Sequence, residues 1–309
     1  MYGNHPAGLG RLGTPESLQA ITLDELRKFY FSRFDPAWVK LGATTADKGS
    51  AIARCEKFLE KLDARLPWAA QKIARPLKIK FEHDAAERPP LWLELPREQS
   101  AVIYAVPGCT ADSPDHLAME ILDVALNGLS SRLFKEIREN NSLAYSTGAS
   151  INFGLVPGMI ALHAGTQPAR AEEALGRLTA EAVKLADGGL TRAEFEAARL
   201  GAVANYARRL EQPDARLVSV LLALFYHEKA ESGLNATTRL RKLRYGDFNR
   251  AVRRCFAGEP QIAVIAGPSA RPVAPAAKRS RGKRSPEQPE LPLYKAGEAR
   301  KNSRIKAKI

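Results

Sequence analysis

The strongest constraint on the fold is a unit that occurs twice in the chain. One copy begins at Ile21 and reads ITLDELRKFYFSRFDPAWVKLGATT, and the other begins at Leu243 and reads LRYGDFNRAVRRCFAGEPQIAVIAGPS. Each copy predicts an amphipathic helix ending near a phenylalanine, then a turn with a proline, then an apolar strand. Such a duplication indicates two similar domains in succession.

The two copies differ in how much chain precedes them. The second comes about 150 residues after a proline-punctuated stretch, whereas the first begins at about residue 20, and repeats normally share a length. We therefore expect the first domain to lack about 130 residues on its N-terminal side. The predicted organisation is an end of the first domain, a linker, a complete second domain and a disordered tail, over residues 1–64, 65–90, 91–267 and 268–309.

Hydrophobic periodicity predicts both helices and strands along this chain. Strands are expected at residues 38–44, 91–94, 100–106, 143–153, 158–165 and 261–266. Helices are expected at residues 22–34, 50–62, 113–126, 131–139, 169–187, 191–211, 214–229 and 245–255. Thr22 and Thr191 each stand three residues before a glutamate, which is the capping-box pattern of a helix start.

Composition excludes several classes of protein. With 45% hydrophobic and 26% charged residues, the chain has the composition of a soluble globular protein with a sizeable core. Its longest apolar run, from Leu217 to Tyr226, is shorter than the roughly 20 residues that a membrane-spanning helix needs. No signal peptide is visible, so the compartment stays open between the cytoplasm and, if a signal precedes this sequence, the periplasm. Three cysteines without a CxxC spacing predict buried thiols rather than a disulfide framework.

The formal charge of +13 is concentrated at the C-terminal end. Residues 271–309 hold 12 Lys and Arg against 3 Asp and Glu, so nine of the thirteen net positive charges lie there. Lysines and arginines in such a tail could contact phosphates of a nucleic acid at low salt. The tail has one aromatic residue, Tyr294, and no recognition motif, so we favour a solvated extension over a nucleic-acid arm.

The stretch SSRLFKEIRENNSLAYS, from Ser130 to Ser146, predicts a helix that leads directly into a strand. An arginine and a tyrosine, Arg138 and Tyr145, stand at that junction. With the flanking SAVIYAVPGCTADSPDHLAMEILDVALNGL, this stretch resembles the start of the second domain of the pitrilysin/insulinase family of zinc peptidases, the inverzincins. The segment from Tyr2 to Thr45 is similar to the close of that family's first domain. The resemblance covers residues 2–267 and departs from the family at Ser142, where a glycine is usual.

The resemblance implies an α+β fold in which each domain has a sheet with helices on one side. It also implies that two such domains face each other around an unfolded protein or peptide substrate. The family's zinc lies in the first domain, bound by an H-x-x-E-H helix and a distant glutamate, and the motif glutamate is the general base.

This sequence has no pair of histidines at the H-x-x-E-H spacing, so we predict no metal ligands in it and no activity by the chain alone. The pair that comes nearest to a set of metal ligands is His116 with Glu120, one helical turn apart. The favoured interpretation of this pair is a surface contact without a metal. Zinc is then expected in the missing segment or in a partner half.

In active members of the family, an arginine and a tyrosine of the second domain reach across the cavity and hydrogen-bond the substrate carbonyl. Arg138 and Tyr145 match this pair in context and spacing, and both side chains can donate to a developing oxyanion. The alternatives are a salt bridge for Arg138 and a packed strand position for Tyr145. Strict alternation would point Tyr145 to the same side as Leu143, so a bulge or a turn at Ser142 would have to redirect the strand.

Three functions follow from these observations. The first is a non-catalytic half of a zinc metallopeptidase, which supplies substrate-binding and transition-state-assisting residues to a zinc-bearing half or partner subunit. The second is a structural core or peptide-binding scaffold subunit without hydrolysis, as a homo- or hetero-oligomer. The third, less favoured, is nucleic-acid binding through the basic tail.

Overall fold

A computed structural model of the chain describes residue 2 and residues 8–10, 12–33, 39–63, 90–226, 228–258 and 261–268. Among the described residues before the predicted linker are the helices α1 (Pro15–Gln19), α2 (Leu23–Arg33) and α3 (Lys48–Asp63). The Thr22 hydroxyl accepts from the Glu25 N–H and the Glu25 carboxylate accepts from the Thr22 N–H, so the predicted capping box is confirmed at the start of α2.

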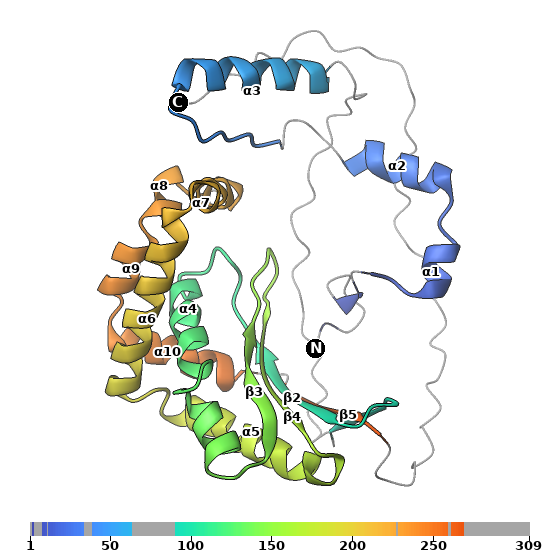
Figure 1. Cartoon of the computed structure of the whole chain (residues 1–309), viewed down its shortest axis with the longest axis vertical. Coiled ribbons are helices and arrows are strands. Elements are labelled where there is room, and N and C mark those ends of the chain that lie inside the picture. Colours follow the sequence, from blue (N-terminus) through green and yellow to red (C-terminus); the bar gives the residue numbers. More distant parts are fainter. Residues whose placement is uncertain are drawn as a thin grey trace. The chain divides into compact units, whose positions relative to one another are not determined.

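A five-stranded sheet organises the residues from Pro90 onward (Figure 1). The strands lie in the order β1-β5-β2-β4-β3. Their bounds are β1 Leu91–Glu94, β2 Ser100–Pro107, β3 Ala144–Ile151, β4 Met159–Thr166 and β5 Ile262–Gly267. β1 pairs with β5 in parallel, and the other neighbours pair antiparallel.

Helices follow and separate these strands, which confirms the α+β class. α4 (His116–Leu126) and the π-helix η3 (Phe134–Glu139) come between β2 and β3. After β4 come the 3-10 helix η4 and six α-helices: η4 Pro168–Arg170, α5 Ala171–Asp187, α6 Arg192–Glu211, α7 Pro213–Phe225, α8 Ala230–Leu234, α9 Ala236–Lys242 and α10 Tyr245–Phe256. Within the described ranges, no helix has the length and apolar character needed to cross a membrane.

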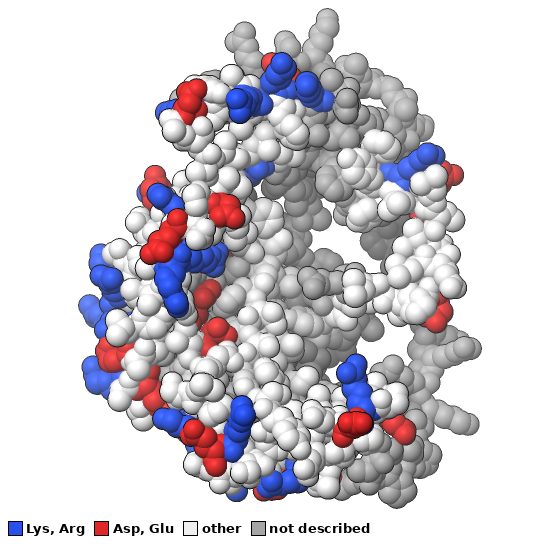
Figure 2. Space-filling model, viewed as in Figure 1, with Lys and Arg blue, Asp and Glu red and all other residues white. Residues whose placement is uncertain are grey.

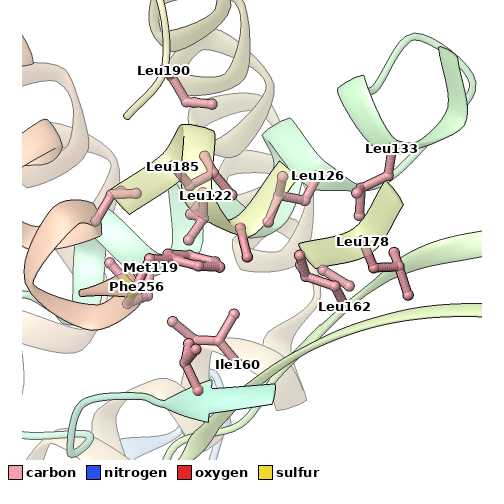
Figure 3. Close-up of a cluster of buried hydrophobic side chains, with 14 of the residues drawn as sticks. Met119, Leu122, Leu126, Leu133, Ile160, Leu162, Leu178, Leu185, Leu190 and Phe256 are labelled. Carbon is pink, nitrogen blue, oxygen red and sulfur yellow. The ribbon is translucent and has the colours of Figure 1, made fainter. Parts of the chain in front are cut away.

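The hydrophobic core lies between one face of the sheet and the helices α4, α5 and α10, as Figure 3 shows. Alternate residues of β2 and β4 enter this core, namely Val102, Tyr104, Val106, Ile160, Leu162 and Ala164. The helices contribute Met119, Leu122, Leu178, Leu185 and Phe256, all fully buried. α4 is apolar over most of its length because it packs against β3 and α10 and also against α6 and α9.

The C-terminal end of α4 covers part of the free edge of β3. The side-chain amide of Asn127 donates to the Ala149 carbonyl at 3.0 Å, and its oxygen accepts from the Ala149 N–H at 2.9 Å. One side chain thus satisfies both backbone groups that Ala149 would otherwise present to another strand.

Two predicted elements differ from the structure. The strand expected at residues 38–44 is wrong over its described part, because residues 39–44 pair with none of the five strands and form no regular element. The helix expected at residues 214–229 ends at Phe225, and Lys229 is extended before α8 begins. Apolar periodicity continues across this break, which is why the sequence did not reveal it.

The four-part division of the chain stays a prediction. Residues 1–270 and 271–309 form two separate units. The second unit, most of the predicted linker and the predicted disordered tail beyond residue 268 lie outside the described residues.

Candidate functional site

The junction between η3 and β3 is built by an irregular helix and a strained turn. η3 has π-helical geometry, which is rare, occurs mostly as single turns and is frequently found at functional sites. It ends where the Ser142 N–H donates to the Arg138 carbonyl at 3.0 Å and the Leu143 N–H donates to the Ile137 carbonyl at 2.9 Å. Ser142 has a φ of 47°, the one positive value among the described non-glycine residues. This conformation explains why glycine is usual there in the family that the sequence resembles.

We predict that Ser142→Gly raises the free energy of unfolding by about 0.5–1 kcal/mol. Removing Cβ relieves a strain of about 1–2 kcal/mol, and the greater freedom of glycine in the unfolded chain offsets part of that gain. Urea unfolding followed by circular dichroism measures the difference. Ser142→Ala keeps Cβ and serves as the control, so equal stability of the glycine and alanine variants would contradict the explanation.

A β-bulge points Tyr145 away from the core. Ala144 pairs with Thr166 and Ser146 pairs with Gly165, so Tyr145 is an extra residue in β3. Leu143 is 3% exposed and packs in the core, whereas Tyr145 is 56% exposed. The bulge, together with the turn at Ser142, removes the conflict between the two side chains that strict alternation creates.

Arg138 is exposed near the C-terminal end of η3. Its guanidinium carbon lies 5.1 Å from the centre of the Phe134 ring, which is a cation–π distance. In the described part of the chain, no carboxylate forms an ion pair with Arg138. The salt-bridge alternative for this side chain therefore has no support among those residues.

Two side chains that the sequence did not single out hold the junction from the other side. Arg170 donates to the Ser142 carbonyl at 3.0 Å and to the Asn141 carbonyl at 3.4 Å. The Gln167 side-chain amide donates to the Tyr145 hydroxyl oxygen at 3.2 Å. Because Gln167 supplies a hydrogen to the phenol oxygen, the hydroxyl's own hydrogen is free to be donated elsewhere. Both residues follow β4, the strand that pairs with β3, and no local signal in the sequence distinguishes them from polar residues that face water.

His116 and Glu120 form a contact on α4 that needs no metal to explain it. Nε2 of His116 lies 3.5 Å from a carboxylate oxygen of Glu120, and the imidazole packs edge-on against Phe153 with ring centres 4.5 Å apart. Burial lowers the pKa of His116 and raises the pKa of Glu120, and a hydrogen bond from Tyr206 opposes the shift of Glu120. Both changes favour neutral groups packed between helices. The pair is less exposed than the predicted surface pair, because α6 supplies Tyr206 beside it.

No set of three metal-ligating side chains comes together in the described ranges. Groups of three or more His, Cys, Asp or Glu that could hold a metal ion do not occur there. His163 is half-buried in β4, and His5, His83 and His227 lie outside the described residues. What the described part of the junction offers chemically is a fixed cation and a phenol, both hydrogen-bond donors.

Comparison with curated proteins finds bacterial relatives that are longer than this chain. A protein of Streptomyces coelicolor named an uncharacterized zinc protease is 32% identical over 193 residues, which cover 62% of this chain and 42% of that protein. A protein of Mycobacterium tuberculosis with the same description is 25% identical over 268 residues, covering 86% and 60% respectively. The chain thus spans about half the length of the curated relatives it matches.

Solved structures share the fold. A peptidase M16 inactive domain from Pseudomonas fluorescens superposes with a TM-score of 0.68 at 20% identity, covering 87% of this chain and 63% of that one. A protease from Helicobacter pylori gives the same TM-score at 17% identity, covering 83% and 61%. The sequence profile described as the peptidase M16 inactive domain matches residues 20–201. These findings confirm the family resemblance that the stretch from Ser130 to Ser146 carries, here called the signature stretch. The chain belongs to the family of the peptidase M16 inactive domain.

Proposed function

We propose that this chain is the non-catalytic half of a zinc metallopeptidase and that it supplies Arg138 and Tyr145 to a substrate bound against a zinc-bearing half. The observation that carries the proposal is the junction itself. An exposed guanidinium and an exposed phenol flank one strained turn, and Arg170 and Gln167 hydrogen-bond the turn and the phenol. A strained, irregular segment held by several polar contacts is typical of a functional site.

The chemistry suits hydrolysis of a peptide bond. When the carbonyl carbon becomes tetrahedral, its oxygen gains negative charge, and preorganised donors stabilise that charge. Arg138 is a permanent cation, and Tyr145 donates a hydroxyl hydrogen that Gln167 leaves free. Zinc, held in the other half, would activate the attacking water. The family resemblance implies the substrate class, a peptide or an unfolded protein, whose backbone carbonyl the two donors would address.

A scaffold that binds partners without hydrolysis is the second candidate. It is favoured by large apolar side chains that α7 leaves exposed, namely Val218, Leu222, Leu224 and Phe225. Exposed apolar side chains gathered on one element are typical of a surface that another protein covers. A scaffold needs this surface but has no need of free donors at the η3–β3 junction.

Reconstitution distinguishes the two functions. We expect the purified chain alone to hold no stoichiometric zinc and to cleave no unfolded substrate. Mixed with a zinc-bearing peptidase half, it should restore cleavage in proportion to the complex formed. A fluorogenic peptide and denatured casein are suitable substrates, with zinc measured by elemental analysis. Formation of a complex whose cleavage rate equals that of the zinc-bearing half alone would support the scaffold and refute the proposal.

A further inference from the structure

A basic pocket lies among the helices of the domain. Its lining residues lie between Arg192 and Gly246, so none of them belongs to the η3–β3 junction. Its volume is about 400 Å³, and it is bounded by the start of α6, the end of α9 and the start of α10. Its charged side chains are Arg192, Glu196, Arg199, Arg241, Lys242 and Arg244. Figure 2 shows Lys and Arg side chains along the flank of the molecule that α6 and α9 form, mixed with Asp and Glu.

The positive charge of this pocket is not neutralised by the residues that the structure describes. Glu196 is its one acidic residue, and it is paired with Arg199. Arg199 also donates to the Arg241 carbonyl at 2.8 Å, so this pair is part of the wall. In the described ranges, no carboxylate forms an ion pair with Arg192, Arg241, Lys242 or Arg244.

Like charges gathered around one hollow repel each other, and an anion between them removes that repulsion. The first turn of α10 begins at the same place without a side-chain cap, and its backbone N–H groups add partial positive charge beside Asp247, which is paired with Arg250. The pocket therefore has more cationic donors than carboxylate acceptors among its lining residues.

Aromatic rings hold part of this basic wall in place. The guanidinium of Arg192 lies 4.9 Å from the centre of the Tyr245 ring, and the Tyr245 hydroxyl donates to the Leu190 carbonyl at 2.8 Å. The guanidinium of Arg199 lies 5.4 Å from the centre of the Phe195 ring. Stacked arginines lose less conformational freedom on binding a ligand than free ones do, which favours a site over a merely charged surface.

We propose that this pocket binds a phosphate group, either as free inorganic phosphate or as the phosphomonoester of a small molecule. Guanidinium groups match the oxygens of phosphate in charge and geometry, and several can share one such anion. A volume of about 400 Å³ leaves room for a small body attached to the phosphate. The proposal is independent of the function assigned to Arg138 and Tyr145.

Isothermal titration of the whole chain with inorganic phosphate and with glycerol phosphate tests this inference, with sodium chloride added to equal ionic strength as a reference. Saturable binding of one phosphate per chain is expected. Arg192→Gln and Arg244→Gln should each weaken it about tenfold, since a hydrogen bond to a charged group contributes at least that factor. Tighter binding of glycerol phosphate would identify the phosphomonoester as the ligand, and equal binding would identify the free anion.

Arg209→Gln is the matched control, because Arg209 lies 5.5 Å from the Tyr206 ring centre and does not line the pocket. It should leave phosphate binding unchanged. Circular dichroism of each variant checks that the fold is retained, and Arg244→Gln serves if loss of the Arg192 stacking unfolds the chain. No saturation beyond the chloride reference, or equal weakening by Arg209→Gln, would overturn the proposal.

Discussion

Replacing Arg132 by methionine is expected to lower the free energy of unfolding by about 3 kcal/mol. Nε of Arg132 lies 3.4 Å from a Glu181 oxygen and 3.3 Å from a Glu194 oxygen, and Nη1 donates to the Gly189 carbonyl at 3.1 Å. The Glu181 side chain is only 4% exposed. Breaking a buried pair by removing one partner leaves an uncompensated charge, which is why the expected effect is large. Lys184 remains beside Glu181 and keeps the loss toward the lower end of the usual range.

Two further variants separate this explanation from a loss of packing. Arg132→Met combined with Glu181→Met replaces the whole pair by apolar groups and should recover much of the stability. Lys184→Met removes a partner whose side chain is 53% exposed, so its effect should stay within about 1 kcal/mol. Chemical unfolding of all four proteins supplies the comparison. An effect of Arg132→Met as small as that of Lys184→Met would show that the buried carboxylate does not depend on this arginine.

The role of Arg132 illustrates what a local pattern leaves out. It lies within the signature stretch that identified the family, yet the sequence singled out Arg138 and gave no role to Arg132. The partners of Arg132 lie far along the chain, on α5, on α6 and in the turn between them. Side-chain partners brought together by helix packing have no fixed spacing, so periodicity does not reveal them.

Local elements were predictable because their signals are local. The hairpin of β3 and β4 and the capped start of α6 at Thr191 occur where the sequence placed them. Pairing between strands that are distant in the sequence was not predicted. The pair of β1 and β5 is an example, because both strands are short apolar runs that could take several positions in a sheet. The prediction of a strand at residues 38–44 was wrong for a related reason: an apolar run forms a strand only when a partner strand lies beside it.

At the candidate site, the residues were predictable but their directions were not. Alternation from Leu143 predicts a buried Tyr145, and the bulge between Ala144 and Ser146 reverses that expectation. One feature of the sequence pointed to an unusual backbone here, namely Ser142 at a position where the family usually has glycine. The positive φ of Ser142 explains that preference. Gln167 and Arg170 went unrecognised because nothing local distinguishes a polar residue that contacts a neighbouring turn from one that faces water.

Arg138→Ala and Tyr145→Phe are each expected to lower the cleavage rate of the reconstituted peptidase by about 10²–10³. Each change removes one donor to the oxygen that gains charge in the transition state. Both side chains are exposed, so the free energy of unfolding should change by no more than about 0.5 kcal/mol. A purely structural role would reverse this pattern, with a clear loss of stability and a rate that follows the amount of folded protein.

The cleavage rate of the Tyr145→Phe complex under single-turnover conditions tests the central claim most directly. The chain is added in excess over a zinc-bearing half so that every zinc site is paired, and assembly is checked by size-exclusion chromatography. Ser146→Ala is the matched control for Tyr145→Phe, and Lys135→Ala on η3 is the control for Arg138→Ala, because both positions are exposed next to the candidate residues. The account predicts a fall of about 10²–10³ for Tyr145→Phe with the controls unchanged. Cleavage by Tyr145→Phe and Arg138→Ala at the unmodified rate would contradict it and leave the chain as a scaffold.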